Sequence, residues 1–194
     1  VDGKTKLNEK NPKWLNDDYV KFIRFSEQHI LKDGKGVLAF ITNNGYLDNP
    51  TFRGMRASLL RTFDKIYIVN LHGNSMKKET APDGSKDENV FDIMVGVSII
   101  IGIKTSQKQD FSKVYYSEVY GTREHKFNVL ENKDIQFKEI KPDNRMAVFI
   151  PQENEDIQNQ YNNGISLIDL FNIYSAGVVT GRDSLCIQNS KQDI

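Results

Sequence analysis

Three side chains directly after an apolar run are the first candidates for chemistry. Asn43, Asn44 and Tyr46 follow the run VLAFI, which is typical of a buried strand. In an open α/β sheet, ligands bind beyond the carboxyl ends of the strands. A second expected strand, at 65–71, leads into a long polar loop at 72–91, and a loop of that length in a compact domain is usually functional or mobile. The two segments should therefore flank one cleft.

The same residues also have purely structural interpretations. Asn43 and Asn44 are typical of an Asx turn that bends the chain before Gly45. Tyr46 can equally be an aromatic residue of that turn. The sequence alone leaves both interpretations open.

Basic residues offer candidate contacts to a nucleic-acid backbone. Lys77 and Lys78 lie in the polar loop, and Arg182 lies in Gly-Arg-Asp near the carboxyl end. Such side chains bind phosphate groups in nucleic-acid complexes. Paired lysines on a polar loop are more often simply solvated, however, and Arg182 can instead pair with Asp183.

Several familiar sites are excluded or disfavoured. The chain has no G-x-G-x-x-G, no Walker lysine loop and no G-x-S-x-G. Its single cysteine, Cys186, excludes a disulfide framework and a cysteine-rich zinc site, and its three histidines lie far apart. A metal nuclease could be drawn from Asp83 with Glu124 and Lys126. Its carboxylates should lie on neighbouring strands, whereas these fall in a loop and an expected helix.

The composition is that of an ordinary packed protein. The 194 residues include 26 Lys+Arg and 26 Asp+Glu, so the formal net charge is zero, which excludes a uniformly basic nucleic-acid binder. A hydrophobic share of 38% is enough for a core. No apolar run reaches the ~18 residues needed to cross a bilayer, so we expect no membrane partner. The single cysteine fits the reducing cytoplasm.

Alternating helix and strand patterns predict an α/β fold. Apolar spacing predicts a helix at 17–32, which Gly34 ends. A strand at 37–41, a helix at 49–63 with Pro50 at its start, and the strand at 65–71 follow. We expect the helices to cover a mainly parallel sheet.

Beyond the loop, an apolar run at about 92–104 predicts a further strand. Because no helix separates it from the strand at 65–71, the two should pair antiparallel. Weaker patterns predict a strand at 114–119, a short helix at 122–130, a brief strand at 146–150 and a helical turn at 165–171.

One block of the chain resembles the second half of the catalytic domain of adenine-N6 DNA methyltransferases, especially those fused into large bacterial restriction–modification polypeptides of type IIG and single-polypeptide type I. It reads FITNNGYLDNPTFRGMRASLLRTFDKIYIVNLHGNS and, after the loop, ENVFDIMVGVSIIIGIK. The resemblance extends weakly upstream to the helix at 17–32. Downstream, IYSAGVVTGRDSLCI is similar to the segment that leads toward target recognition.

The resemblance implies a partial Rossmann-like methyltransferase sheet with a final antiparallel strand and a small α+β extension. It divides the chain into a polar lead-in at 1–16, the carboxyl-terminal half of the catalytic domain at 17–107, and an extension at 108–194 that leads into a DNA-recognising region.

The family also has an aromatic residue that stacks on the adenine flipped out of the duplex, at the start of the final antiparallel strand. Phe91 occupies that place, and Tyr46 resembles an aromatic that walls the pocket, beside Asn43 and Asn44. Stacking on an extruded base contributes ~1–3 kcal/mol. Phe91 can equally be the first core residue of its strand.

Two motifs of the family are absent. One is the glycine-bearing loop that holds S-adenosylmethionine, and the other is the Asn/Asp-Pro-Pro-Tyr/Phe tetrapeptide that holds the adenine amine. The segment Asn11-Pro12-Lys13-Trp14 matches the tetrapeptide only in part, because Lys13 replaces its second proline. We therefore expect a fragment that binds neither cofactor nor metal by itself and supplies one wall of the base pocket.

The implied partners are double-stranded DNA, through the full-length enzyme, and the missing amino-terminal half of the catalytic domain. The strand at 37–41 would border that missing half, so self-association through its unpaired edge is also expected. Two alternatives remain: a non-catalytic DNA-binding or interaction module with a methyltransferase-like sheet, and a small α/β domain without nucleic-acid function.

Overall fold

The computed structural model describes residues 12–106, 112–143, 146–152, 163–165 and 170–171. The chain divides into two units, residues 1–151 and 152–194, and every element named below lies in the first. The helices are α1 (Asp18–Asp33), α2 (Arg53–Thr62) and α3 (Arg123–Glu131), with short 3-10 turns η1 (Pro12–Asn16), η2 (Asn44–Leu47), η3 (Pro50–Phe52) and η4 (Ser75–Lys77). The strands are β1 (Gly36–Asn43), β2 (Lys65–His72), β3 (Val97–Lys104), β4 (Lys113–Glu118) and β5 (Lys138–Ile140).

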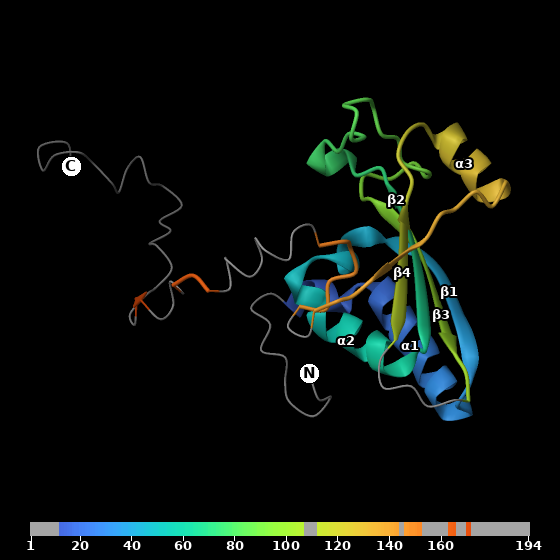
Figure 1. Cartoon of the computed structure of the whole chain (residues 1–194), viewed down its shortest axis with the longest axis vertical. Coiled ribbons are helices and arrows are strands. Elements are labelled where there is room, and N and C mark those ends of the chain that lie inside the picture. Colours follow the sequence, from blue (N-terminus) through green and yellow to red (C-terminus); the bar gives the residue numbers. More distant parts are fainter. Residues whose placement is uncertain (1–11, 107–111, 144–145, 153–162, 166–169, 172–194) are drawn as a thin grey trace, which may run out of the picture. The chain divides into compact units, whose positions relative to one another are not determined.

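These five strands form one open sheet in the order β1-β3-β2-β4-β5 (Figure 1). β3 runs antiparallel to both β1 and β2, β2 pairs parallel with β4, and β5 is antiparallel to β4. The predicted antiparallel pairing across the long loop is confirmed. The prediction of a mainly parallel sheet is wrong, because β3 is inserted between β1 and β2 and opposes the direction of both.

Helices α1 and α2 cover one face of the sheet and form the core with it (Figure 1). α1 ends at Gly34, whose φ of 76° is left-handed and whose N–H donates to the Ile30 carbonyl, so the predicted stop is confirmed. The ring of Phe63 lies directly over Gly102 of β3, where a Cβ atom would come within 2.9 Å of the ring carbons. That close approach explains a glycine inside a strand. The side chains packed in this layer are Ile23, Ile30, Leu38, Leu59, Phe63, Ile66, Ile68 and Ile100.

The character of the helix-covered face changes along the strands. Apolar rows occupy most of it, but the row nearest the carboxyl ends of β1, β2 and β4 is polar. In that row Thr42 lies opposite Ser98, Ser98 opposite Asn70, and Asn70 opposite Glu118. Buried polar groups require hydrogen-bond partners, so this end of the sheet is specified by hydrogen bonds rather than by apolar packing.

The opposite face and the β1 edge leave apolar surface uncovered within the described residues. Val37 and Ile41 of β1 are 64% and 56% exposed, and β1 is the first strand of the sheet order. On the same face, toward the carboxyl end of β2, Val129 and Leu130 of α3 pack on a small cluster that includes Val69. None of the helices in the described ranges combines the length and apolar character that a membrane span requires.

Three predicted elements need correction or lie outside the description. β3 begins at Val97 rather than near residue 92. The segment 146–150 is not a strand: Phe149 is buried there, and the carbonyls of Met146 and Ala147 accept hydrogen bonds from the buried guanidinium of Arg56 instead of from a neighbouring strand. The predicted helical turn at 165–171 falls largely outside the described residues.

Candidate functional site

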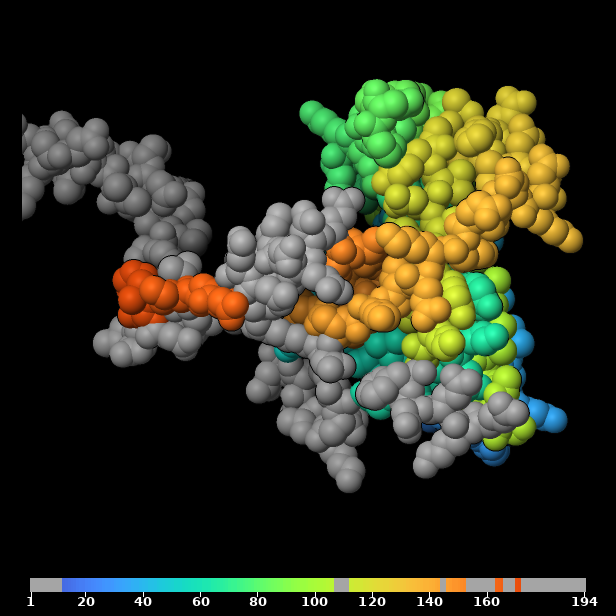
Figure 2. Space-filling view, in the orientation of Figure 1, coloured from blue at the N-terminus to red at the C-terminus, as the bar shows by residue number. Residues whose placement is uncertain are grey.

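The carboxyl ends of three strands meet at one end of the sheet. β1, β2 and β4 run in the same direction, so Asn43, His72 and Glu118 terminate them at the same edge. The antiparallel β3 starts there, and the long loop and α3 lie against each other at this end (Figures 1 and 2). All the described site candidates are positioned by these elements.

The two asparagines after β1 have defined structural partners. The Asn43 side chain accepts a hydrogen bond from the Gly45 amide at 2.7 Å and starts η2, which is the Asx turn that its residue type allows. The Asn44 amide donates at 3.1 Å to the Asn70 side chain, and its backbone N–H bonds to the Gly96 carbonyl at 2.9 Å. Asn44 therefore links the end of β1 to β2 and to the start of β3.

The two candidate aromatics differ sharply in accessibility. Tyr46 is 0% exposed and packs in the core against Tyr19, so it offers no surface to a base in this structure. Burial raises the pKa of its hydroxyl, although a hydrogen bond with Ser98 opposes that shift. Phe91 is 44% exposed and lies six residues before β3, in the irregular segment that leads into it. The interpretation of Phe91 as a core residue of the strand is therefore wrong, while its role in stacking stays a prediction.

A network of hydrogen bonds joins β2, β4 and the loop behind these residues. The Asn70 amide donates to the Tyr116 hydroxyl at 3.1 Å, and that hydroxyl donates to Glu118 at 2.9 Å. The His72 ring contacts Glu118 through Nε2 at 3.3 Å and Glu79 through Nδ1 at 2.7 Å. The hydrogen bond with His72, supported by that with Tyr116, lowers the pKa of Glu118 against the effect of its partial burial.

His72 combines an unusual backbone conformation with a stacked ring in this network. Its φ of 51° places a non-glycine residue in the left-handed region, and its ring stacks on Tyr120 at a centroid distance of 3.8 Å. Through its two nitrogens the ring joins the loop, at Glu79, to the end of β4, at Glu118.

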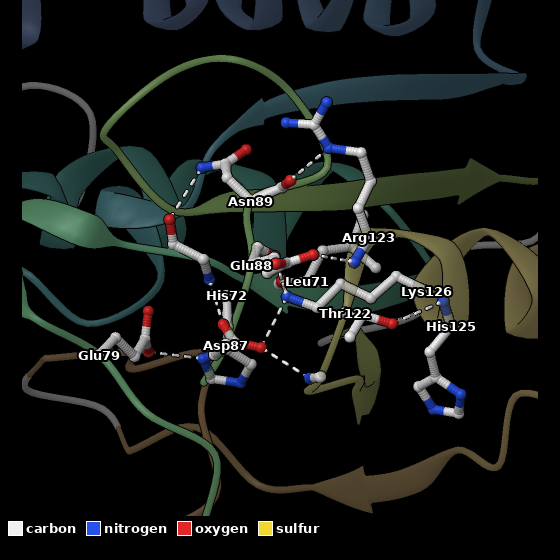
Figure 3. Close-up of polar contacts among 12 residues, drawn as sticks. Leu71, His72, Glu79, Asp87, Glu88, Asn89, Thr122, Arg123, His125 and Lys126 are labelled. Carbon is white, nitrogen blue, oxygen red and sulfur yellow. Dashed lines mark hydrogen bonds and ion pairs between the residues drawn. The ribbon is translucent and has the colours of Figure 1, made fainter. Parts of the chain in front are cut away.

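A buried ion pair fastens the second half of the loop to α3 (Figure 3). Lys126 and Asp87 meet at 2.7 Å with both side chains 0% exposed. The Lys126 ammonium also donates to the carbonyls of Leu71 at 2.7 Å and Glu88 at 2.6 Å. The Asp87 carboxylate also accepts the amides of two glycines, Gly73 at 2.6 Å and Gly121 at 2.8 Å. Every charge in this cluster is thus hydrogen-bonded, as buried charges must be.

Asn89 and Arg123 fix the segment just before Phe91. The Asn89 side chain accepts the Phe91 amide at 2.9 Å and donates to the carbonyls of Gly73 at 2.9 Å and Val95 at 2.7 Å. Arg123 donates from Nε to the Asn89 carbonyl at 2.9 Å (Figure 3). A Cβ atom on Gly73 would lie 2.5 Å from Asn89 Cα, so only glycine permits this contact between the two ends of the loop.

The predicted basic contacts are only partly described. Lys77 and Lys78 are exposed on the loop, and their contact with a nucleic-acid backbone stays a prediction. Arg182 lies outside the described residues. Among the residues with described positions, no group of three His, Cys, Asp or Glu side chains could hold a metal ion. Lys126 is buried against Asp87, which removes it from the metal-nuclease arrangement considered above.

Sequence reasoning missed His72, Asp87, Asn89 and Arg123, and it considered Lys126 only as part of a metal-nuclease arrangement. The short helix predicted at 122–130 is present as α3, and the structure shows Thr122 as its N-cap, with a hydroxyl that accepts the His125 amide. Nothing in the spacing, however, shows that two basic residues one helical turn apart would contact a loop about 35 residues earlier. Such a contact depends on the parallel pairing of β4 with β2, which brings α3 beside the loop.

Comparison with solved structures shows what this arrangement is similar to. The ATP-dependent Type ISP restriction–modification enzyme LlaBIII, solved bound to DNA, matches 92% of this chain at 32% sequence identity and a TM-score of 0.71. The chain resembles part of a restriction–modification enzyme. A DrdV–DNA complex matches 92% of the chain at 27% identity and a TM-score of 0.68. A nuclease-deletion mutant of the Type ISP enzyme LlaGI, in complex with a DNA substrate mimic, matches 78% at 26% identity and a TM-score of 0.64.

The likeness covers almost all of this chain but a small part of those enzymes. The chain spans 12%, 19% and 12% of their respective lengths. It matches no protein-family model and no curated protein sequence. The predicted resemblance to restriction–modification enzymes is confirmed at this level, while the assignment to their methyltransferase part stays a prediction.

Proposed function

We propose that this chain is the carboxyl-terminal half of the catalytic domain of a DNA adenine-N6 methyltransferase within a restriction–modification enzyme. In this role it supplies part of the pocket for an adenine flipped out of double-stranded DNA. The observation that carries the proposal is Phe91, an aromatic side chain left 44% exposed on a segment whose backbone is fixed at the carboxyl end of the sheet. The similarity to three enzymes solved with DNA or a DNA mimic supports the same assignment.

The physical role of Phe91 would be to replace lost stacking. An adenine that leaves the duplex loses its neighbouring bases, and an aromatic face recovers ~1–3 kcal/mol of that loss. The surrounding hydrogen bonds hold the backbone of Phe91 in place before the base arrives. Lys77 and Lys78, exposed on the same loop, would contact the phosphate backbone.

The cofactor of this reaction would be held elsewhere. S-adenosylmethionine supplies the methyl group when bound, and its usual glycine-bearing loop has no counterpart in this sequence. The polar side chains at the carboxyl edge, Asn44, Asn70 and His72, have protein partners in this structure. The described residues therefore do not fit a cofactor cradle, and we assign to this chain contacts with the DNA alone.

Replacing Phe91 in the intact enzyme tests the proposal. Phe91→Ala should slow single-turnover methylation of cognate DNA by about 5- to 150-fold, which is the range equivalent to ~1–3 kcal/mol of lost stacking. Phe91→Trp should retain most of the rate, because its larger ring preserves an aromatic face.

The matched control is Phe127→Ala. Phe127 lies on α3 and is 43% exposed, so it has nearly the same accessibility as Phe91 without lying on the loop. Its replacement should leave the rate within twofold of the parent. Equal rates for Phe91→Ala and the parent enzyme would refute the proposed role of Phe91.

A further inference from the structure

We propose that Arg123, acting from α3, is a positioning residue that holds Phe91 ready for the flipped base. This inference rests on the proposed function and deepens it. It assigns a role to α3, which the resemblance in sequence left without one. The evidence is a set of contacts from Arg123 to three residues on both sides of Phe91, namely Glu88, Asn89 and Asp92.

Arg123 contacts this segment from three of its own groups. Its backbone N–H donates to the Glu88 carboxylate at 3.1 Å, and its Nε donates to the Asn89 carbonyl at 2.9 Å. Its Nη2 pairs with Asp92 at 2.7 Å. The three acceptors lie on both sides of Phe91, so a single guanidinium and its backbone span the segment that carries the ring.

The hydrogen bond from Arg123 to the Asn89 carbonyl is the contact that positions Phe91. Asn89 accepts a hydrogen bond from the Phe91 amide and donates to the carbonyls of Gly73 and Val95, which lie near the two ends of the loop between β2 and β3. The pair with Asp92 contributes less, since the Asp92 side chain is 93% exposed and exposed ion pairs are weak. Arg123 would therefore act mainly by fixing the peptide of Asn89.

The two basic residues of α3, Lys126 and Arg123, hold different parts of the loop. The buried pair of Lys126 and Asp87 anchors the loop to α3 as a whole. Arg123 is the first residue of α3, one turn before Lys126, and it contacts Asn89 and Asp92 on either side of Phe91. A segment that is already ordered by folding loses less conformational entropy when the base binds. Without Arg123 the segment around Phe91 would have to become ordered during binding, which weakens binding.

A double-mutant cycle in the full-length enzyme tests the inference. Arg123→Ala should lower the single-turnover methylation rate by about tenfold, because the loss of one orienting charge-assisted hydrogen bond is of that size. In an enzyme that already carries Phe91→Ala, the same change should lower the rate by less than twofold. Arg123→Lys should lie between the parent and Arg123→Ala, because a lysine is a single point donor.

A spectroscopic measurement distinguishes positioning from general structural damage. With 2-aminopurine in place of the target adenine, the parent should quench the fluorescence of the flipped base by stacking. Arg123→Ala should relieve the quenching while its melting temperature stays close to that of the parent. Lys21→Ala, which removes an exposed ion pair with Asp18 on α1, is the matched control and should change neither signal.

The possible outcomes separate the two proposals. If the rate losses of Arg123→Ala and Phe91→Ala multiply in the double variant, Arg123 acts independently of Phe91 and the inference is overturned. If Phe91→Ala has no effect by itself, the proposed function fails first. If Arg123→Ala does not fold, Arg123→Lys gives the same cycle, and full activity of that variant with unchanged quenching would also overturn the inference.

Discussion

Lys126→Met should be one of the most destabilising single changes in the loop and α3. The ammonium of Lys126 is fully buried, pairs with Asp87 at 2.7 Å and donates to two backbone carbonyls. Methionine preserves most of the volume but leaves the Asp87 carboxylate charged and buried without its counter-ion. Breaking a buried pair in this way typically costs about 3 to 5 kcal/mol. Against a total stability of roughly 5 to 15 kcal/mol, the loss would be large.

Urea unfolding of the 194-residue chain, followed by circular dichroism, measures this loss. The control is Lys86→Met, which removes an ion pair with Glu88 whose lysine is 83% exposed and should cost no more than about 1 kcal/mol. Adding Asp87→Asn to Lys126→Met should restore part of the lost stability, since it removes the unpaired charge and keeps an acceptor oxygen for one of the two glycine amides.

Amide hydrogen exchange provides an independent measurement. Gly73 and Gly121 donate their backbone N–H groups to Asp87, so both should exchange faster in Lys126→Met while amides in the β1–β3 pairing change less. A loss of stability below about 1 kcal/mol would mean that the Asp87 charge reaches water without Lys126, and it would refute the description of this pair as a buried anchor.

Three further predictions concern other parts of the chain. Burial would raise the pKa of Asp64, but hydrogen bonds from Thr105 and the charge of Lys104 outweigh burial and hold that pKa below its usual 3.8. The stability that Asp64 contributes is therefore present above pH 3.8 and is lost as the pH falls through the lower pKa of the folded state. Asp64→Asn should flatten the acid limb of a stability–pH curve. The exposed edge of β1 should cause self-association that Ile41→Lys reduces, measured by size-exclusion chromatography with light scattering; a parent that is monomeric at every concentration would contradict this. Titration calorimetry of the isolated chain with S-adenosylmethionine should show weak binding or none, and micromolar affinity would overturn the view that other parts of the enzyme hold the cofactor.

The elements that the sequence predicted best are those with one clear signal at each end. α1 combines a sustained apolar stripe with a terminal glycine, and the structure gives Asp18–Asp33 with Gly34 in the left-handed region. β2 lies between charged and polar residues and extends only one residue beyond its predicted end. In both elements, local sequence and tertiary packing favour the same conformation.

Two strand predictions were wrong because their apolar residues lie outside regular secondary structure. Ile93 and Met94 extend the apolar pattern of β3 toward its amino terminus, but they are 46% and 59% exposed in the irregular segment before it. Phe149 is buried without belonging to a strand, because Arg56 of α2 accommodates the neighbouring carbonyls. Hydrophobic spacing detects burial and regularity together, so it cannot recognise an exposed apolar loop or a buried irregular one.

The inserted antiparallel strand explains why the segment that carries Phe91 lies at the carboxyl ends of β1 and β2, even though the predicted start of that strand was wrong. A strand parallel to β1 and β2 would begin at their amino ends, and the loop before it would cross to the opposite edge of the sheet. β3 is antiparallel to both, so the segment that leads into it must arrive at their carboxyl ends, beside Asn44. Phe91 is therefore held near this edge whether the first paired residue is 92 or 97. What the sequence could not supply is the restraint on that segment, which comes from Arg123 and Lys126 of α3, an element that reaches the same edge only because β4 pairs parallel with β2.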